Sequence, residues 1–350
     1  MKKALKIILW IILAIIVIAA LFFGYLTLRE YKPADVTPVG VRGDSSGEKV
    51  PSGKEIVVLS WNTGYAALGK NSDFVMDGGG NVPPADKEQV NEYMTGIKNT
   101  LDSLNADIYM LQEVDEDSDR SFNTDQRDVY TAGQDAIGYN YKCDYVPFPW
   151  PPMGKVNSGV FTTTGYSIDS ADRYSLPCPF SWPLRIANLK RCLLASYLPI
   201  EGSDKQLVIV NFHLEAYDSG EGKIAQTKQL LEFIEGEYAK GNYVIAGGDW
   251  NQTFPGSLDV YPNTHEDLWA VGLIDSGSFK DGWTLAYDTS SPTCRLLNQP
   301  YNPDDGVNTQ YYVIDGFVCS PNVNVISCNT VDEGFENSDH NPVRMIVTLK

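Results

Sequence analysis

The sequence predicts an α/β protein folded as a four-layer α/β sandwich, with two packed mixed β-sheets flanked by helices, preceded by an N-terminal transmembrane helix. Short apolar runs typical of buried strands recur along most of the chain. Helical spacing occurs in only two stretches of the same region. Polar residues suited to chemistry follow several separate strands, where loops leave them accessible. A doubly wound parallel sheet is the alternative, and the irregular alternation of strands and helices disfavours it.

Composition places the chain among globular proteins. Its 350 residues suit one or two domains, and its 43% hydrophobic and 21% charged residues exclude wholesale disorder. The formal net charge is −18 and no basic block appears, so we expect no stable complex with nucleic acid. The protein is expected to be a monomer. An enzyme that contacts a phosphodiester only during reaction, with metal ions screening the charge, is compatible with this balance.

The N-terminus carries the first predicted element. Lys2, Lys3 and Lys6 precede an apolar run over residues 7–28. Its 22 residues exceed the ~20 that cross a bilayer and the roughly 7–15 of a signal-peptide core, and no good cleavage site follows. The positive-inside rule then predicts a short cytoplasmic segment 1–6, a transmembrane anchor 7–28, and a single-pass protein of the cell membrane whose body lies outside the cytoplasm. A long, cleaved signal peptide is the alternative, and it also exports the body.

The chain changes character after the apolar run. Residues 29–54 are rich in Pro, Gly and Ser without apolar periodicity, so they predict a flexible linker, and residues 55–350 are expected to form one large domain. Residues 1–32 hold five basic residues and one acidic residue, so the remaining chain has a charge of −22. Anionic membranes and DNA repel such a body alike.

Within this domain the elements are expected in a definite order. Strands are predicted at 56–59, 108–111, 160–163, 192–198, 207–212, 243–246, 311–318 and 343–349, and helices at 86–104 and 223–238. The six cysteines lack metal-binding spacing, and Cys192 and Cys319, inside apolar strands, are predicted to be buried thiols.

Two loops combine proline with aromatic residues, at 145–152 and 176–183. If they flank a site, they are suited to stack on a nucleobase or to meet lipid at a membrane interface. Alternatively, proline only stiffens loops whose rings pack on the sheet. The membrane anchor slightly favours substrates close to a bilayer.

Two polar patterns are predicted to lie outside any site. Asp115, Asp117 and Asp119 imitate the start of a calcium-binding loop, but Arg120 stands where such a loop needs Gly. We therefore expect a solvated acidic turn. His265 lies in a Pro- and Asn-rich stretch and is expected at the surface.

The candidate functional residues sit at strand ends. They are Asn62, Glu113, His213, Asp249, Asn251 and Asp315, each at or just after the end of an apolar strand or, for Asp315, within the run 311–318, together with Asp339 and His340 in a polar turn before the last strand. Carboxylate and amide oxygens are the hard ligands that Mg²⁺ and Mn²⁺ prefer. Each residue alone is a weak signal, whereas the ordered series is much harder to explain by chance.

This series resembles the endonuclease/exonuclease/phosphatase superfamily, which includes DNase-like and sphingomyelinase-like enzymes. The resemblance covers residues 56–349 and is sharpest at Gln112-Glu113-Val114, Gly248-Asp249-Trp250-Asn251 and Ser338-Asp339-His340-Asn341-Pro342. The family usually has Phe at the position of Trp250 and often Thr at the position of Phe212. Neither departure touches a reacting atom.

The resemblance implies an enzyme, a Mg²⁺- or Mn²⁺-dependent hydrolase acting on phosphate ester bonds, with the catalytic domain at 55–350. It implies metal ligands at Glu113, Asn62 and Asp339, and substrate contacts at Arg191 and Asn157. It further implies catalytic roles for His340, Asp315, Asp249, His213 and Asn251. His340 oriented by Asp315 is the acid/base pair, Asp249 positions or deprotonates water, and the last two donate hydrogen bonds to phosphoryl oxygens. Whether the His–Asp pair or Asp249 is the base stays open.

The first hypothesis is therefore a membrane-anchored, extracytoplasmic phosphodiesterase whose substrate is a lipid, a small phosphodiester or nucleic acid. A secreted or tethered nuclease of the same superfamily is a close alternative. A tethered module that binds phosphorylated ligands without turnover is a third hypothesis, and the intact set of Glu113, Asp249 and His340 disfavours it. An adhesive surface protein is the weakest alternative, because it gives the strand-end carboxylates no role.

Overall fold

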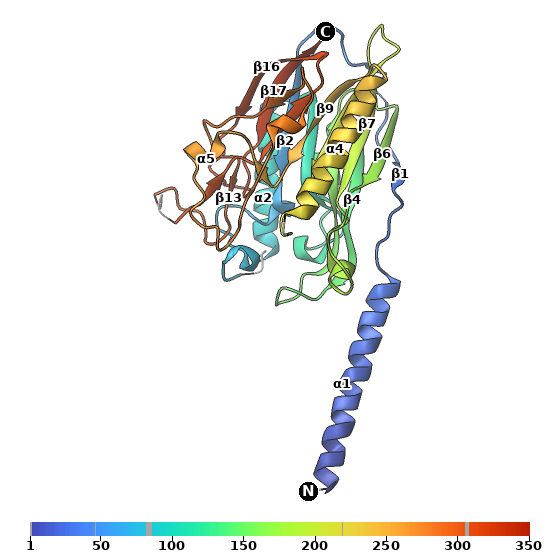
Figure 1. The fold of residues 1–350 in the computed structure, drawn as a ribbon, viewed down its shortest axis with the longest axis vertical. Coiled ribbons are helices and arrows are strands. Elements are labelled where there is room, and N and C mark those ends of the chain that lie inside the picture. Colours follow the sequence, from blue (N-terminus) through green and yellow to red (C-terminus); the bar gives the residue numbers. More distant parts are fainter. Residues whose placement is uncertain (1, 46, 82–85, 219, 305–307) are drawn as a thin grey trace.

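A computed structural model of the chain describes residues 2–45, 47–81, 86–218, 220–304 and 308–350. A long helix, α1 (Lys2–Leu28), extends from one end of a layered α/β body (Figure 1). Residues 1 and 46, which fall in the expected N-terminal segment and linker, lie outside the described residues.

Two large mixed sheets form the body. The first has the order β16-β17-β2-β3-β5-β4. Its strands are β2 (Ile56–Asn62), β3 (Ile108–Asp115), β4 (Gln134–Val146), β5 (Gly154–Thr164), β16 (Val323–Thr330) and β17 (Val343–Leu349). The second has the order β1-β6-β7-β8-β9-β15-β12. Its strands are β1 (Val36–Val39), β6 (Ser170–Ser175), β7 (Cys192–Pro199), β8 (Gln206–His213), β9 (Tyr243–Asp249), β12 (Thr284–Ala286) and β15 (Asp315–Cys319).

Smaller elements connect these strands. Two short sheets pair β10 (Gln252–Thr253) with β11 (Gly272–Leu273) and β13 (Cys294–Arg295) with β14 (Tyr311–Tyr312). The helices of the body are α2 (Lys87–Leu104), α3 (Gln126–Tyr130), α4 (Glu221–Ala239) and α5 (Ser257–Val260). Single helical turns lie at η1 (Gly64–Ala66), η2 (Val75–Asp77), η3 (Asp119–Ser121), η4 (Leu184–Ala187) and η5 (Ser276–Ser278).

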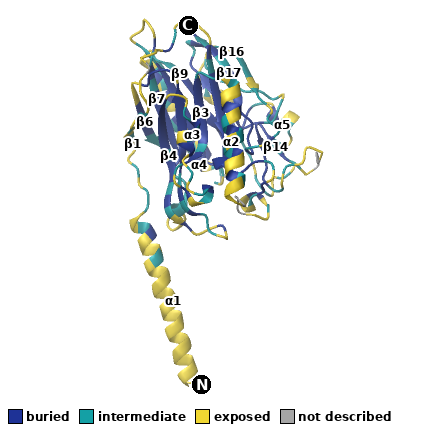
Figure 2. Ribbon diagram, turned by 180° about the vertical axis from the view of Figure 1, so that it is seen from behind, coloured by how far each residue is buried: buried dark blue, intermediate teal, exposed yellow. Residues whose placement is uncertain are grey.

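Three hydrophobic clusters define four layers. Between the sheets, Met110 on one side packs in a cluster with Ile245 and Phe317 on the other. The apolar side chains of α2, among them Ile97, pack on the outer face of the six-stranded sheet. Those of α4, among them Leu230, pack on the outer face of the seven-stranded sheet. The predicted four-layer sandwich is confirmed, and Figure 2 shows α2 with an exposed outer face over buried strands.

Local signals explain why α2 begins and ends where the sequence predicts. The Asp86 side chain accepts a hydrogen bond from the Gln89 backbone N–H at 2.8 Å, which satisfies a free donor of the first turn. The helix ends at Asn105, in the left-handed conformation that Asn tolerates better than most residues.

The predicted apolar runs all lie in strands, although the run 311–318 is divided between β14 and β15. The sequence did not indicate β4, the longest strand. Its apolar side chains are interrupted by charged residues such as Lys142 and Asp144, and by Gly138, so it has no continuous apolar run. A strand that contributes edge pairing and half-buried positions gives a weak sequence signal.

The stretch expected to be a flexible linker differs from that expectation. β1 pairs antiparallel with β6 at the edge of the seven-stranded sheet, and Val50 is fully buried in the core between the sheets. The Arg42 and Asp135 backbones also form an isolated bridge. Backbone hydrogen bonding to an edge strand needs few apolar side chains, so composition alone does not reveal it.

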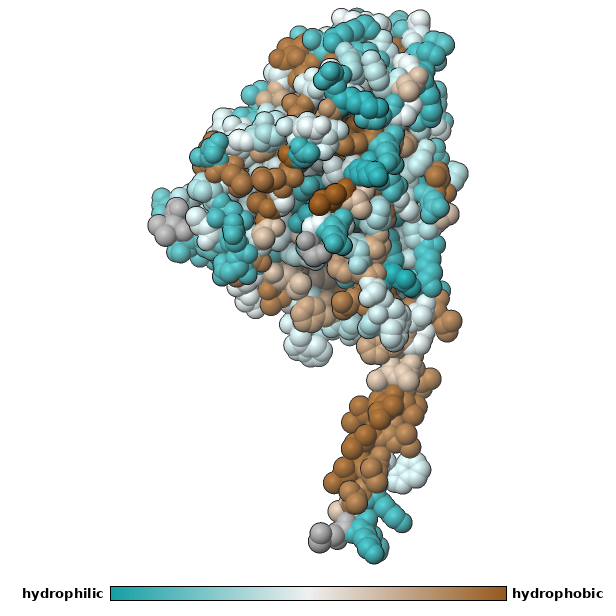
Figure 3. All heavy atoms as spheres, viewed as in Figure 1, coloured by the Kyte–Doolittle hydropathy of each residue, from teal (hydrophilic) through white to brown (hydrophobic). Residues whose placement is uncertain are grey.

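The helix α1 is long and apolar enough to cross a membrane, and its most apolar part is not buried against the body. A membrane span and a signal sequence both have this character. Figure 3 shows its apolar surface extending from the body toward the lysines near its N-terminal end.

Candidate active site

Three strands of the seven-stranded sheet place polar side chains in one row. The parallel register of β8 and β9 sets His213 opposite Asp249. The antiparallel register of β9 and β15 sets Asp249 opposite Asp315. His213 and Asp249 are the last residues of their strands and Asp315 is the first of its own, so all three lie at the same sheet edge. Strand pairing therefore brings together residues far apart in the sequence.

The six-stranded sheet supplies the facing side chains. Asn62 ends β2 and pairs with Gln112 of β3. The register of β3 with β5 shifts between Leu111 and Val114, and Glu113 within this bulge has a positive φ of 56°. Bulges and left-handed residues of this kind concentrate at functional sites, where they redirect a side chain.

A buried amide pair links the two sheets beneath these residues. The Gln112 side-chain amide donates to Asn211 Oδ1 at 2.8 Å, and the Asn211 amide donates to the Leu111 carbonyl at 3.1 Å. Both side chains are fully buried. Because β3 and β8 belong to different sheets, this pair holds the two strand ends at a common level.

The Asp249 carboxylate lies at the centre of a polar cluster that it forms with Asn62, His213, Asp315 and His340. Its Oδ2 accepts a hydrogen bond from Asn62 Nδ2 at 3.0 Å and lies 3.3 Å from His213 Nε2 and 3.7 Å from His340 Nε2. Its Oδ1 accepts from the Asn251 backbone N–H at 2.9 Å. Burial, together with the nearby charge of Asp315, raises the pKa of Asp249 to about 6.

His340 is held from both sides. Its Nδ1 lies 2.9 Å from Asp315 Oδ2, while its backbone carbonyl accepts from Trp61 Nε1 at 2.8 Å. Burial disfavours the charged ring, but Cys294 and Asp315 raise the pKa of His340 well above its ordinary value. By contrast, burial and then the charge of Arg191 lower the pKa of His213 well below its ordinary value. The two imidazoles thus favour opposite charge states.

Glu113 and Asp339 face the same pocket. Glu113 Oε2 is buried with no hydrogen-bond partner among the described residues, and Oε1 lies 3.8 Å from His213 Nδ1. Burial raises the pKa of Glu113, and burial together with Glu113 raises that of Asp339 to about 7. A half-buried Glu113 carboxylate with a free oxygen and the buried Asp339 carboxylate that it repels, next to the Asn62 amide, fit a divalent cation with hard oxygen ligands.

A second group of possible metal ligands overlaps this one. Ligand atoms of Asp249, Asp315 and His340 all lie within 4.8 Å of one another. His340 Nδ1 and Asp315 are already hydrogen-bonded to each other, so this group is better arranged for moving a proton than for holding a cation.

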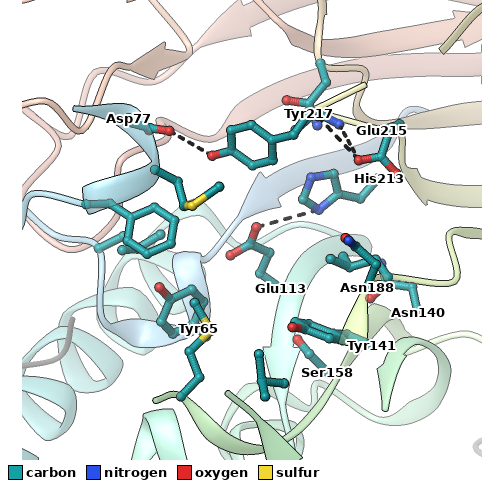
Figure 4. Close-up of a pocket in the computed structure, with 18 of the residues that line it drawn as sticks. Tyr65, Asp77, Glu113, Asn140, Tyr141, Ser158, Asn188, His213, Glu215 and Tyr217 are labelled. Carbon is teal, nitrogen blue, oxygen red and sulfur yellow. Dashed lines mark hydrogen bonds and ion pairs between the residues drawn. The ribbon is translucent and has the colours of Figure 1, made fainter. Parts of the chain in front are cut away.

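These side chains line one pocket with a cavity volume of about 460 Å³. Figure 4 shows Glu113 and His213 directed at each other inside it. Eight residues expected from the sequence line the pocket: Asn62, Glu113, Arg191, His213, Asp249, Asn251, Asp339 and His340. Asp315 lies behind His340. Asn157 is not among the lining residues, whereas Ser158 and Asn140 are. His265 is half-buried and lies outside the pocket.

The structure adds Arg120, which sequence analysis missed. Its guanidinium forms two hydrogen bonds with the Asp115 carboxylate, at 2.8 and 2.9 Å, and lies 3.7 Å from the Tyr65 ring centroid. The expectation of a solvated turn is wrong for Asp115, which is fully buried. A buried carboxylate needs a partner, and the adjacent Arg120 supplies it. Only their short separation in an acidic stretch hinted at this pair.

Two further features of the pocket concern its hydrogen bonding. The Tyr217 hydroxyl donates to Asp77 Oδ1 at 2.8 Å (Figure 4). Arg191 is buried, lies 3.7 Å from Glu215 Oε2, and keeps Nε and Nη1 without a hydrogen-bond partner among the described residues. An unsatisfied buried guanidinium is a ready partner for an anion.

Comparisons with known proteins agree with this geometry. The model of the Endonuclease/Exonuclease/phosphatase family matches residues 59–340. Curated protein sequences give no match. An endonuclease/exonuclease/phosphatase from Beutenbergia cavernae DSM 12333 shares 16% identity over 85% of this chain and 72% of its own, with a TM-score of 0.57. The human Nocturnin catalytic domain, solved with a bound sulfate anion, shares 18% sequence identity over 89% of this chain and 98% of its own, with a TM-score of 0.51. TDP2 from C. elegans shares 16% sequence identity over 87% of this chain and 78% of its own, also with a TM-score of 0.51. Identities this low show a common fold alone.

Proposed function

The chain belongs to the endonuclease/exonuclease/phosphatase family, and from this premise we propose that it is a membrane-anchored, extracytoplasmic, divalent-metal-dependent phosphodiesterase. Members of this family are hydrolases of phosphate esters. The observation that carries the proposal is the Asp249 carboxylate set between His213 and His340, with the Asp315 carboxylate on the far side of the His340 ring. The apolar helix α1 supports the anchor.

We assign the metal site to Glu113, Asn62 and Asp339, whose oxygens suit Mg²⁺ or Mn²⁺. When bound, such an ion neutralises charge on the phosphoryl oxygens and stabilises the leaving oxygen. The unpaired Glu113 Oε2 and the repulsion between Glu113 and Asp339 support this assignment.

The protein groups then divide the proton transfers. Asp249 Oδ2 accepts a proton from the attacking water as the water oxygen bonds to phosphorus. His340 Nε2 donates a proton to the ester oxygen as the phosphorus–oxygen bond breaks, because Asp315 on Nδ1 favours the imidazolium. The 3.7 Å between the two atoms allows the proton to return afterwards and restore both groups.

The remaining polar groups bind and orient the phosphate. His213 and Asn251 donate hydrogen bonds to phosphoryl oxygens as charge develops there. One N–H of the Asn251 amide is already given to the Leu214 carbonyl at 2.8 Å, which fixes the orientation of the other. Arg191 has free N–H groups for a further oxygen of the substrate. Asn157, outside the pocket lining, is proposed only as a more distant contact.

The test uses the full chain in detergent and bis(p-nitrophenyl) phosphate, with Mg²⁺ or Mn²⁺ against EDTA. We expect metal-dependent turnover that falls by about 10³-fold in His340→Ala. His265→Ala, the matched variant outside the pocket, should keep wild-type activity. Plasmid DNA in the same assay tests the nuclease alternative, which the charge of −18 disfavours. Absence of turnover by folded, metal-loaded protein on the soluble ester, on DNA and on phospholipid vesicles would overturn the proposal in favour of a binding module.

A further inference from the structure

The pocket has an apolar part beside the polar cluster. Three segments contribute uncharged side chains to it: the end of α1, the loop between β4 and β5, and the loop between β6 and β7. Its lining includes Phe23 and Leu26, Pro147 and Phe148, and Leu184 and Ile186. Apolar walls next to a few convergent polar groups are typical of sites for ligands with an apolar portion.

The end of α1 is a built part of this wall. Leu26 is 3% exposed, although the rest of the described helix is exposed or half-buried. The Phe22 ring packs edge-to-face on Tyr145, with centroids 5.9 Å apart. Seven residues further along the chain, Arg29 Nε lies 2.7 Å from Asp144 Oδ2. These contacts hold the helix against the end of β4.

The last turn of α1 and the residues just after it are held against the loop between β6 and β7. Trp182 Nε1 donates to Thr27 Oγ1 at 3.1 Å. The Glu30 side chain is 1% exposed, and its carboxylate forms ion pairs with Arg185 Nε at 2.8 Å and with Lys190 Nζ at 3.7 Å. An ion pair buried on the carboxylate side fixes the position where the helix leaves the body. The loop between β6 and β7 is therefore joined to α1 directly, and the other loop is joined to it through the end of β4.

The same end of the body exposes large apolar side chains. The exposed fraction is 63% for Phe148, 82% for Trp150, 56% for Trp182 and 66% for Leu184. In Figure 1 both loops lie at the end of the body from which α1 extends. Tryptophan favours the membrane–water interface, and exposure of this apolar area is unfavourable in water. If α1 crosses a bilayer, these side chains meet its surface.

We infer that the pocket binds a phosphate ester of a membrane lipid, with the phosphate at the polar cluster and the apolar tail between α1 and the two loops. The inference rests on the proposed function and names the substrate class of the same site. The helix is then part of the substrate site as well as an anchor, because Phe23 and Leu26 form one of its walls. A nucleic acid strand needs free cations along its path, whereas the wall side chains named above are uncharged. The cations in the same segments, Arg29 and Arg185, are already paired with Asp144 and Glu30.

The test compares two substrates on the same protein. Full-length protein is reconstituted in phosphatidylcholine vesicles that carry sphingomyelin, phosphatidylglycerol or phosphatidic acid, and release of the head group or phosphate is measured. Bis(p-nitrophenyl) phosphate, which has no acyl tail, is measured in parallel. We expect lipid turnover in at least one vesicle type. If the protein hydrolyses the soluble ester or DNA but none of the lipids, the lipid inference is overturned and the phosphodiesterase proposal stays intact. Turnover of neither substrate would overturn the proposed function itself.

Variants of the wall locate the tail. Phe148→Ser and Leu26→Asp should each lower the ratio of lipid to soluble-ester turnover by at least about 10-fold, because each replaces apolar wall with polar surface. Ile326→Ser, an exposed apolar side chain on β16, is the matched control and should leave the ratio unchanged. The ratio cancels any loss of folded protein, and Phe148, being mostly exposed, decides the outcome if Leu26→Asp does not fold. An unchanged ratio in Phe148→Ser would overturn the placement of the tail.

Discussion

The two parts of the pocket are built in different ways. The polar cluster comes from strand ends aligned by register across β8, β9 and β15, and its side chains are buried. The apolar wall comes from α1 and two loops, and several of its side chains are exposed. A site fixed by sheet pairing keeps its geometry as long as the core is intact, whereas a wall held by a few contacts can change alone. The chemistry and the choice of substrate are therefore separable in this molecule.

The largest expected effect is on the polar cluster. Asp249→Asn keeps the shape of the side chain but removes its charge, so kcat on the soluble ester should fall by about 10³-fold. In EDTA the same variant should raise the melting temperature at pH 7. The pKa of Asp249 is raised on folding, so its ionisation between 3.8 and about 6 favours the unfolded chain. Activity within tenfold of wild type would contradict the central role of this carboxylate.

The next effect concerns the register that aligns the cluster. Gly248 has a φ of 145°, and a Cβ there would collide with the backbone carbonyl oxygen of Phe212 on β8. Gly248→Ala should lower the free energy of unfolding by about 1–3 kcal/mol and reduce kcat, since Asp249 is the next residue.

Gly236 provides the matched control. It lies inside α4, and a Cβ there meets no atom within 4 Å. Gly236→Ala should raise the free energy of unfolding by about 0.5–1 kcal/mol, because alanine favours the helix. Urea unfolding of both variants checks the pair, and an equal response of the two glycines would count against register as the organising feature.

The smallest effect concerns the contact between α1 and the body. Burial raises the pKa of Glu30, but hydrogen bonds from Arg185 and Lys32 outweigh burial and lower it below 4.5. The carboxylate therefore stabilises the docked helix fully above pH 4.5, and this contribution is lost as pH falls through the lowered value.

The fluorescence emission of Trp182 is obtained as the difference between the protein and its Trp182→Phe variant. It should report this loss, because the Trp182 indole donates a hydrogen bond to Thr27 at the same junction. Glu30→Gln should abolish the acid transition. A transition of the same size in both proteins would assign it to another group. The activity of Glu30→Gln on the soluble ester near neutral pH shows whether the change at the helix junction leaves the polar cluster unaffected.

The strand-end residues were predictable because each follows or begins its own apolar run. His213 and Asp249 close two such runs, and Glu113 follows a third. The glycines and the bulge that aim these side chains were less visible, since a left-handed Glu113 depends on the pairing of β3 with β5. Arg120 was missed altogether, because its role depends on the burial of Asp115, which the chain sequence does not display.

Local patterns in the chain predict the α/β class, the two outer helices, the apolar N-terminal helix and the candidate residues at strand ends, because hydrophobic periodicity and strand termination are local properties. The folded structure is needed to show which strand ends meet, that β1 pairs with the sheet edge, and that α1 forms a wall of the pocket. Those outcomes depend on contacts between distant segments, such as Thr27 with Trp182 and Glu30 with Arg185. No local pattern encodes such contacts, since their free energy exists only when the chain is folded.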